Sequence, residues 1–395
     1  MNVDCPTVVK AAPLAESVVL LDGGADAYPR MLLAINRAKR TVHLEVYAFA
    51  PSGVGALFIA ALVEAQGRGA RVEVVIDGWG SALGGRAVAA ALRVGGCDVT
   101  IYNRLRAVLI GRFGRNHRKI LLVDDEVAFI GGINIGDENV ADGARVAWAD
   151  LGLEITGPAC ARLGQMIRRE PHRLGEGSLS ILLCGVGGGW RLRRRYLKAF
   201  EGARDRIHVA HGYFLPDRRL VRAITAAARR GVQVRLLLAG QSDVPFARAA
   251  TRSLYHRLLK AGVIIHEWSG SVLHAKVATV DGRCLLVGSF NLDPFSLANL
   301  EALVEVDNRA VVARGEAWIE SRFAGSRTVT KVDASSRLQR WVLDPLGLLV
   351  ARAAGLLSRL LGRRTRPGPH RRGSPEQHGV QRSVDVGVRA RSAEK

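Results

Sequence analysis

The sequence contains one short pattern twice, and this duplication constrains the fold more than any other feature. Each copy has a histidine, a lysine two positions later and an aspartate seven positions after the histidine: His117, Lys119 and Asp124, then His274, Lys276 and Asp281. The chain has only eight lysines and ten histidines. Because chance gives roughly 0.2 histidine-x-lysine pairs in such a chain, we interpret the two copies as parts of one duplicated unit.

The repeat extends on both sides of this pattern. Asn134 and Asn291 each follow their histidine by 17 residues, and Gly131-Gly132 aligns with Gly288-Ser289. Upstream, each copy shows a strand pattern, a helical stretch and a second strand, at 40–49, 56–66 and 72–76 and again at 205–214, 220–230 and 234–238. This order predicts an α/β fold with two repeated halves of about 160 residues, each a largely parallel or mixed β-sheet that is flanked by helices and covered on both faces.

Breaks in these patterns divide the chain. Glycines and prolines between 170 and 189 predict a linker, so we expect a first half over 1–172 and a second half over 173–330. In the apolar segment 345–361, two arginines cost about +6 kcal/mol against about −4 kcal/mol from leucine and valine, which disfavours a membrane span. We predict an amphipathic helix at 331–362, lying in a membrane interface or packed on the protein, and a disordered basic tail at 363–395.

The composition limits the partners and the compartment. A net charge of +21 predicts attraction to polyanions, either nucleic acid or an anionic membrane surface. Five scattered cysteines without a C-x-x-C pair predict neither a disulfide framework nor a cysteine zinc site. Residues 1–17 lack the apolar run of a signal peptide, so we expect no export.

Paired histidines and lysines suit the cleavage of a phosphodiester. An in-line displacement needs a nucleophile on one side of phosphorus, a proton donor on the other and positive charge around the remaining oxygens. Of His117 and His274, one can attack while the other acts as the acid. The phosphate oxygens are expected to be bound by two lysines and two amides: Lys119, Lys276, Asn134 and Asn291.

The alternation of side chains along a strand separates the aspartates from these groups. His117 and Lys119 share a face, whereas the aspartate of the motif has the opposite parity, and the second copy repeats this. We therefore expect the motif aspartates Asp124 and Asp281 to hold backbone or an ion pair rather than to touch phosphate. Asp150 and Glu301, which lie 33 and 27 residues after the two histidines, are candidates to orient the imidazoles.

Two further points concern metals and a second pair of histidines. A protonated lysine has no lone pair, so we expect no metal site at the motif and a catalysis that needs no metal or other cofactor. His43 and His208 occupy equivalent positions in the repeat, and we interpret them as strand residues near the floor of the site.

The motif residues resemble the phospholipase D superfamily, whose signature H-x-K-x4-D followed by Gly-Gly/Ser-x-Asn occurs twice per chain. Residues 30–310 carry the resemblance, and Asn116-His-Arg-Lys with Gly-Gly-Ile-Asn134 is similar to bacterial cardiolipin synthases. The resemblance implies one bilobal unit with the site between the halves. It also implies His117 as the nucleophile that forms a phosphohistidine and His274 as the acid/base, with the reverse assignment open, and histidines oriented by Asp150 and Glu301.

We therefore predict a membrane-peripheral phosphatidyltransferase on the cytoplasmic face of the cell membrane, with phosphatidylglycerol or a related phospholipid as substrate. A phospholipase D hydrolase is one alternative, because water can also resolve a covalent intermediate. A nuclease of the same superfamily is another, in which the basic charge binds nucleic acid; the segment 345–361 and the lack of aromatic stacking sets argue against it. A non-catalytic membrane-binding module is disfavoured by the two complete motifs. The oligomeric state stays open.

Overall fold

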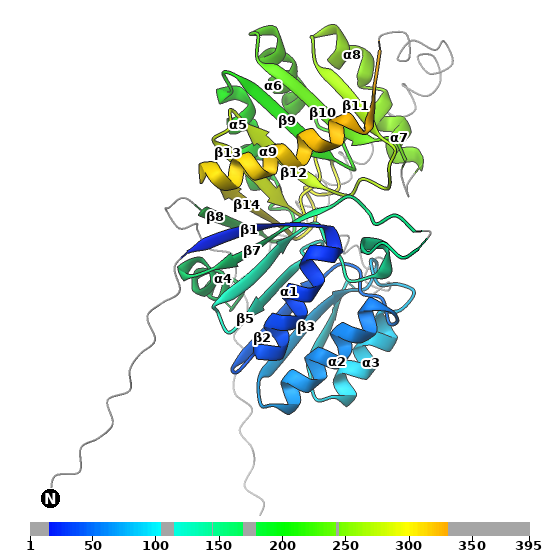
Figure 1. Cartoon of the computed structure of the whole chain (residues 1–395), viewed down its shortest axis with the longest axis vertical. Helices are drawn as coiled ribbons and strands as arrows, with labels where there is room; N and C mark the ends of the chain where they lie inside the picture. Colours follow the sequence, from blue (N-terminus) through cyan, green and yellow to red (C-terminus); the bar gives the residue numbers. More distant parts are fainter. Residues whose placement is uncertain (1–15, 104–113, 144, 169–178, 242–244, 331–395) are drawn as a thin grey trace, which may run out of the picture. The chain divides into compact units, whose positions relative to one another are not determined.

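The computed structural model describes residues 16–103, 114–143, 145–168, 179–241 and 245–330 of the 395. Within these ranges the chain forms two β-sheets with helices on their faces (Figure 1). The predicted boundary at 172/173, the predicted helix at 331–362 and the predicted basic tail at 363–395 lie outside the described residues.

The first half builds a mixed sheet. Its strands are β1 (Ser17–Asp22), β2 (Thr41–Val46), β3 (Arg71–Asp77), β4 (Asp98–Tyr102), β5 (Ile120–Val123), β6 (Val127–Gly131) and β7 (Leu151–Thr156). Its helices are α1 (Gly23–Arg37), α2 (Val54–Gly67), α3 (Gly85–Val94), the 3-10 turn η2 (Asp137–Asn139) and α4 (Pro158–Arg168). The strand order is β1-β7-β6-β5-β2-β3-β4, with β2, β3 and β4 parallel and the other pairs antiparallel.

The second half repeats this plan. Its strands are β8 (Leu179–Cys184), β9 (Arg206–His211), β10 (Gln233–Ala239), β11 (Ile264–Trp268), β12 (Lys276–Val280), β13 (Cys284–Gly288), β14 (Glu301–Val306) and β15 (Ser326–Thr328). Its helices are α5 (Trp190–Gly202), α6 (Arg218–Arg229), α7 (Pro245–Arg252), α8 (Tyr255–Lys260) and α9 (Arg309–Ala324). The order β15-β11-β10-β9-β12-β13-β14-β8 is that of the first sheet with β15 added at one edge.

The shared strand order confirms the predicted duplication and the mixed α/β class. The predicted strand, helix and second strand of each half correspond to β2, α2 and β3 and to β9, α6 and β10. One expectation was wrong, because residues 179–184 of the predicted linker form β8, which pairs with β14. Leu179-Ser-Ile-Leu-Leu-Cys184 is a short apolar run, and such a run favours a buried strand over a linker.

Helices cover the outer face of each sheet. In the first half α1, α2 and α3 pack on β2 and β3 around Ile35, Phe58 and Ile76, which are fully buried. In the second half α5, α6 and α8 pack on β9 and β10 around Phe200 and Leu236. The central strand β5 is buried on both faces, which explains why it reads as the uninterrupted apolar run Ile-Leu-Leu-Val.

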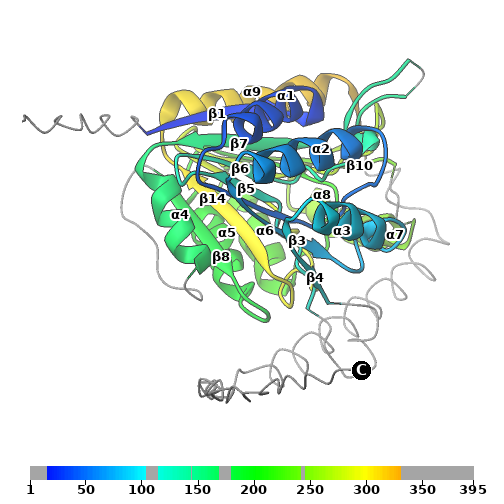
Figure 2. The same cartoon turned by 90° about the horizontal axis from the view of Figure 1, so that it is seen from below.

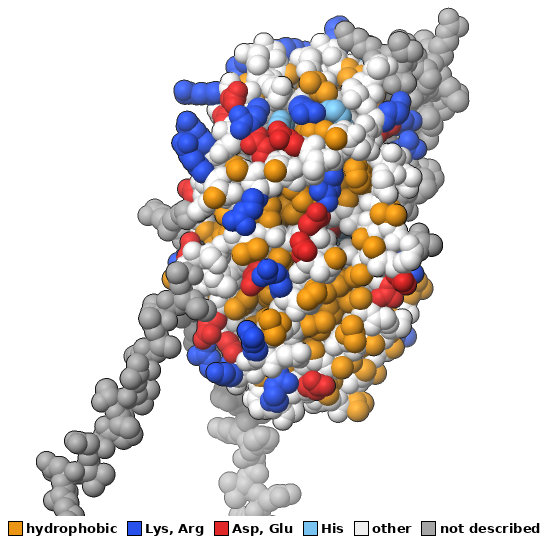
Figure 3. Space-filling view, viewed as in Figure 1, with side chains coloured by type: hydrophobic (Ala, Val, Ile, Leu, Met, Phe, Trp, Pro, Cys, Tyr) orange, Lys and Arg blue, Asp and Glu red, His pale blue; other side chains and the backbone are white. Residues whose placement is uncertain are grey.

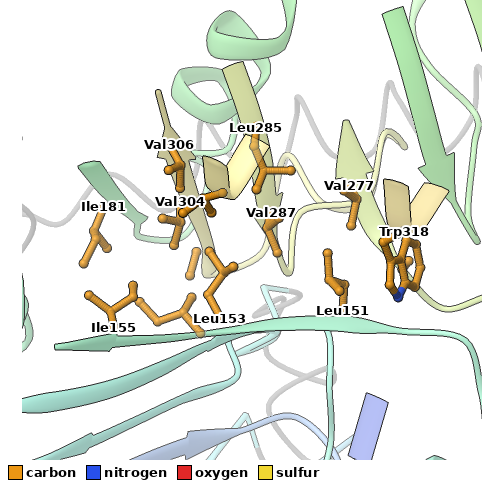
Figure 4. Packing of buried hydrophobic residues seen from close by; sticks show 14 of the residues in the cluster. Leu151, Leu153, Ile155, Ile181, Val277, Leu285, Val287, Val304, Val306 and Trp318 are labelled. Atoms are coloured by element: carbon orange, nitrogen blue, oxygen red, sulfur yellow. The ribbon is translucent and has the colours of Figure 1, made fainter. Parts of the chain in front are cut away.

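The inner faces of the two sheets share one hydrophobic core. Figure 4 shows Leu151, Leu153 and Ile155 of β7 facing Val287 and Val304 of the second sheet. Helices α4 and α9 add apolar side chains to the same core. The two halves are thus held together by packed side chains, which fixes the relative positions of the loops at the ends of their strands.

Helix α9 also joins the halves by polar contacts. Trp318 Nε1 donates to Asp22 Oδ1 at 2.8 Å, and Arg322 Nη2 donates to both oxygens of the same carboxylate at 2.7 and 2.9 Å. Asp22 ends β1, and α9 lies beside β1 in both views (Figure 1 and Figure 2). This helix of the second half therefore rests directly on the first half.

Candidate active site

The two motif histidines lie just before equivalent strands, at the line where the halves meet. His117 precedes β5, and its backbone N donates to Leu300 O at 2.9 Å; His274 precedes β12, and its backbone N donates to Ala149 O at 2.9 Å. Two isolated bridges, Asn116 with Leu300 and Ala149 with Leu273, accompany these bonds. Each histidine is therefore held beside the residue that precedes the carboxylate of the other half.

The carboxylates that orient the histidines come from across the interface. His117 Nδ1 lies 3.1 Å from Glu301 Oε2, and His274 Nδ1 lies 2.6 Å from Asp150 Oδ2. Both predicted carboxylates contact a histidine, and each contacts the histidine of the other half. The reason is the pair of bridges between the halves, which places Glu301 beside His117 and Asp150 beside His274.

The hydrogen bonds of the imidazoles also fix their tautomers. His117 Nδ1 lies 3.1 Å from Ser289 O, a carbonyl that only accepts, so Nδ1 carries the proton. The Nε2 atom of His117 then keeps its lone pair. His274 Nδ1 likewise donates to the Asp150 carboxylate.

The lysines and two tyrosines complete the polar centre. Lys119 Nζ donates to His117 O at 2.7 Å, and Lys276 Nζ donates to His274 O. Lys119 Nζ lies 4.9 Å from the centroid of the Tyr47 ring, and Lys276 Nζ lies 5.9 Å from that of Tyr213. Our sequence reasoning missed these tyrosines, although an aromatic residue at the end of both equivalent strand segments was a usable signal.

Further contacts hold the first motif from behind. The backbone N of Asn116 donates to Asp77 Oδ2 at 2.8 Å, and its side-chain amide donates to Glu45 Oε2 at 2.8 Å. Arg118 and His43 also contact the Glu45 carboxylate, at 3.3 and 3.2 Å. Burial alone would raise the pKa of Glu45, but His43 and Arg118 hold it at about 2. His43 is therefore linked through Glu45 to Asn116, the residue before His117.

The predicted asparagines lie at equivalent places, and both are buried. Asn134 Oδ1 accepts from Ala48 N at 3.2 Å, which leaves its amide group as a donor. Asn291 Oδ1 is buried with no hydrogen-bond partner among the described residues, and its backbone N donates to Ser296 Oγ at 3.2 Å. Both amides follow the strands β6 and β13, at the same interface as the histidines.

The small residues before the asparagines are required by close contacts. A Cβ atom on Gly288 would lie 2.2 Å from Ala302 O, and one on Gly132 would lie 2.2 Å from Asp150 Oδ1. At the position equivalent to Gly132, the hydroxyl of Ser289 donates to Glu301. The first copy therefore has Gly132 where the neighbouring carboxylate is that of Asp150, and the second copy has Ser289 where it is that of Glu301.

The motif aspartates behave as the strand parity predicted. Asp124 accepts from the backbone N atoms of Lys39, Arg40 and Thr41 at 2.8–2.9 Å. Asp281 accepts from those of Arg204, Asp205 and Arg206 at the same distances. Both therefore hold the turn before the neighbouring strand, at the end of β5 or β12 opposite to the lysine.

Burial controls the protonation of the site. Burial and the charge of Lys276 lower the pKa of Lys119 to about 7. Burial, with Lys119 and Lys276, also lowers the pKa of His117 well below its ordinary value. The histidine–carboxylate pairs made across the halves bring these groups into one polar centre, where their charges act on one another.

The two histidine–carboxylate pairs differ in charge. Burial raises the pKa of Glu301 to about 7. Burial alone would also raise the pKa of Asp150, but His274 and Lys276 hold it below its ordinary value. Asp150 is thus ionised beside His274, whereas Glu301 and His117 approach a neutral pair at neutral pH.

Known proteins resemble this sequence over both halves. Residues 31–159 and 196–323 match the family model described as cardiolipin synthase, PLD-like domain. Cardiolipin synthase B of Salmonella typhi is 35% identical over 321 residues, which cover 74% of this chain and 76% of that protein. The cardiolipin synthase B of Escherichia coli K12 is 34% identical over the same shares.

A solved structure supports the fold. The crystal structure of phosphatidylserine synthase from Haemophilus influenzae Rd KW20 superposes with a TM-score of 0.68 and covers 89% of this chain and 97% of its own. Its sequence is 15% identical, so this likeness concerns the fold.

Proposed function

Because the chain belongs to the family of cardiolipin synthases with PLD-like domains, as its motifs predicted, we propose that it is a phosphatidyltransferase that works through a phosphohistidine. The observation that carries the proposal is the meeting of two histidine–carboxylate pairs, each made across the halves, beside Lys119. An in-line displacement at phosphorus needs a nucleophile, an acid and positive charge in this arrangement.

In the first step His117 Nε2 attacks the phosphorus of the donor lipid. The N–P bond forms while the P–O bond to the head-group alcohol breaks, and His274 gives its proton to the leaving oxygen. The charge gathered on the other phosphate oxygens is stabilised by Lys119, Lys276 and the amides of Asn134 and Asn291.

The different charges of the two pairs support this division of roles. His117 is neutral at neutral pH because burial lowers its pKa, and a neutral imidazole is the nucleophilic form. Burial and the charge of Lys276 lower the pKa of His274, but the ionised Asp150 opposes this shift and so stabilises a proton on His274, which is what a general acid requires. The reverse assignment would place the proton on the imidazole next to Glu301, whose negative charge is reduced because burial raises its pKa to about 7.

In the second step an alcohol resolves the intermediate. The hydroxyl of phosphatidylglycerol attacks phosphorus, its proton passes to His274, and the N–P bond breaks, so that His117 is restored. Water in place of the alcohol gives hydrolysis, so the transferase and the hydrolase share every step but the acceptor.

We also propose that the protein acts at an anionic membrane surface. Trp79 and Phe295 are 37% and 55% exposed, and both belong to loops next to the site. Arg115 lies 5.0 Å from the Trp79 ring and donates from its backbone to Asn299, which closes the Phe295 loop. Aromatic rings beside arginines suit the interface between lipid tails and anionic head groups. No helix among the described residues has the length and apolarity to cross a bilayer.

The test of the transferase uses the purified full-length protein with phosphatidylglycerol vesicles, with and without phosphatidylethanolamine, and identifies the products by mass spectrometry. Cardiolipin with release of glycerol or ethanolamine supports the proposal. Phosphatidic acid alone would make the protein a hydrolase. DNA cleavage without lipid turnover would make it a nuclease.

The intermediate is tested with phosphate-labelled lipid. His274→Asn should label His117 slowly, because the leaving oxygen lacks its acid, and should then keep the acid-labile label, because departure of the phosphatidyl group needs the base. His117→Asn should take up no label, and a label on another residue would overturn the assignment of the nucleophile.

Membrane docking is tested by sedimentation with vesicles that contain phosphatidylglycerol. The double variant Trp79→Ala/Phe295→Ala should bind several-fold more weakly than the wild type. Leu57→Ala is the control, because Leu57 is 59% exposed, close to the exposed fraction of Phe295, but lies on α2. Equal binding of all three proteins would contradict the proposed surface.

A further inference from the structure

A second cluster of ligand-type side chains lies in the second half, between β9, β12 and α9. His208 is 1% exposed, and its Nδ1 lies 3.6 Å from Glu316 Oε1 and 3.7 Å from Glu320 Oε1. Glu316 and Glu320 are four residues apart on α9, so their side chains share one face of the helix. Acidic side chains gather on the surface over this helix in Figure 3. None of the three residues belongs to the repeated motif.

The distances in the cluster suit a shared metal ion better than hydrogen bonds. Separations of 3.6 and 3.7 Å are longer than a hydrogen bond from an imidazole to a carboxylate. Zinc with tetrahedral bonds of about 2.0–2.2 Å keeps its ligand atoms about 3.4 Å apart. One atom from each of the three side chains lies within 4.8 Å of the other two. Only small side-chain movements would therefore bring all three to one ion.

Buried polar atoms in the cluster lack partners. Neither ring nitrogen of His208 makes a hydrogen bond of ordinary geometry among the described residues, and the same holds for Thr279 Oγ1. Thr279 is directly opposite His208 in the pairing of β12 with β9, so both side chains point to the α9 side of the sheet. Buried polar atoms without partners are costly, and a bound ion with its water would satisfy them.

The surrounding charges allow a cation. Arg206 donates to both carboxylate oxygens of Glu316, and such a bond orients a ligating carboxylate. Arg235 is turned toward the Phe323 ring at 3.9 Å and toward His266 at 3.3 Å. Burial lowers the pKa of His208, which keeps the imidazole neutral and able to bind a metal. Glu320 is half exposed and leaves a path from solvent.

We propose that His208, Glu316 and Glu320 bind one divalent transition-metal ion, for which zinc is the fitting probe. One imidazole and two carboxylates form a donor set that zinc accepts, with water at the remaining position. The ion would tie α9 to the second sheet. Because α9 also holds Asp22 of the first half through Trp318 and Arg322, its expected effect is on the stability of the joined halves.

The experiment is a calorimetric titration of the chelator-treated full-length protein with zinc sulfate. The wild type should bind one equivalent, Glu320→Gln should bind at least tenfold more weakly, and His208→Gln should lose the site. Glu201→Gln, an exposed carboxylate on α5, is the matched control and should bind like the wild type. Zinc should raise the melting temperature of the wild type and of this control, and leave that of His208→Gln unchanged.

Three outcomes would overturn the proposal. One is a wild type that binds no zinc. The second is equal zinc binding by the wild type, His208→Gln and Glu320→Gln. The third is loss of binding in His117→Asn, which would place the ion at the catalytic motif. If circular dichroism shows that His208→Gln does not fold, the zinc affinity of Glu320→Gln, a change at a half-exposed residue, decides between the outcomes.

Discussion

Replacement of Asp150 by asparagine tests the pairing across the halves most directly. Asp150 is fully buried, and its Oδ2 accepts from His274 Nδ1 at 2.6 Å. Asparagine keeps the shape of the side chain but removes the negative charge that favours a proton on His274. The protein should still fold, because the amide oxygen can keep accepting from Leu151 N, while the amide NH2 then faces His274 Nδ1 in place of the acceptor.

The magnitude follows from the charge that is lost. Opposite charges about 4 Å apart at an effective dielectric constant of 20 interact by about 4 kcal/mol. Since each pKa unit equals about 1.4 kcal/mol, the pKa of His274 should fall by up to about three units. If His274 is the acid, kcat for phosphatidyl transfer should then fall by about 1,000-fold.

Glu301→Gln provides the comparison. Burial raises the pKa of Glu301 to about 7, so at pH 6 this carboxyl is already mostly protonated, and the amide should lower kcat by only about tenfold. The measurement is single-turnover transfer from phosphatidylglycerol vesicles at pH 6, with circular dichroism to confirm folding. A Glu301→Gln loss equal to or larger than that of Asp150→Asn would refute the assigned roles, and an Asp150→Asn enzyme within threefold of the wild type would refute the pairing.

Three further predictions concern single residues. Because the pKa of Lys119 is about 7, its positive charge is lost as the pH rises through 7, so kcat/KM should fall above pH 7; Lys119→Gln should lower it at least about 100-fold and flatten this limb of the profile. Gly132→Ala should lower kcat nearly as much as Asp150→Asn, because its Cβ would displace the Asp150 carboxylate; unchanged kinetics would contradict this close contact. Asp281→Ala should cost about 2 kcal/mol of unfolding free energy by calorimetry, with kcat retained by the folded enzyme. Backbone N–H groups lower the pKa of Asp281, so this difference should shrink as the pH falls through that pKa.

The repeat made much of the fold predictable. A strand, a helix and a second strand at matching places in each copy identified β2, α2 and β3 and their equivalents, because these patterns reflect which side chains are buried. The prediction failed at β8, where glycine and proline nearby suggested a linker although the apolar run Leu179–Cys184 was itself a strand signal. Helix and strand ends could not be read as reliably as their existence.

The candidate site divides in the same way. The spacing of His117, Lys119 and Asp124 identified the motif, and parity alone separated Asp124 from the other two, because side chains alternate along β5 whatever lies around it. The tyrosines beside the lysines and the residues behind Asn116 were missed. For the tyrosines, the aromatic residue at the end of both equivalent segments was a signal that we overlooked. The contacts of Asn116 join strands that are far apart in the sequence, and no local pattern marks them.

The sequence by itself determined that there are two copies of one α/β unit, which residues form the two motifs, and which aspartates hold backbone instead. These features depend on periodicity and spacing, which are properties of a single segment. Only the tertiary structure decided that Glu301 serves His117 and Asp150 serves His274, and that His208 meets Glu316 and Glu320 of α9. These contacts depend on how the sheets pack and on where the bridges between the halves form. The separation of two residues along the chain does not predict either.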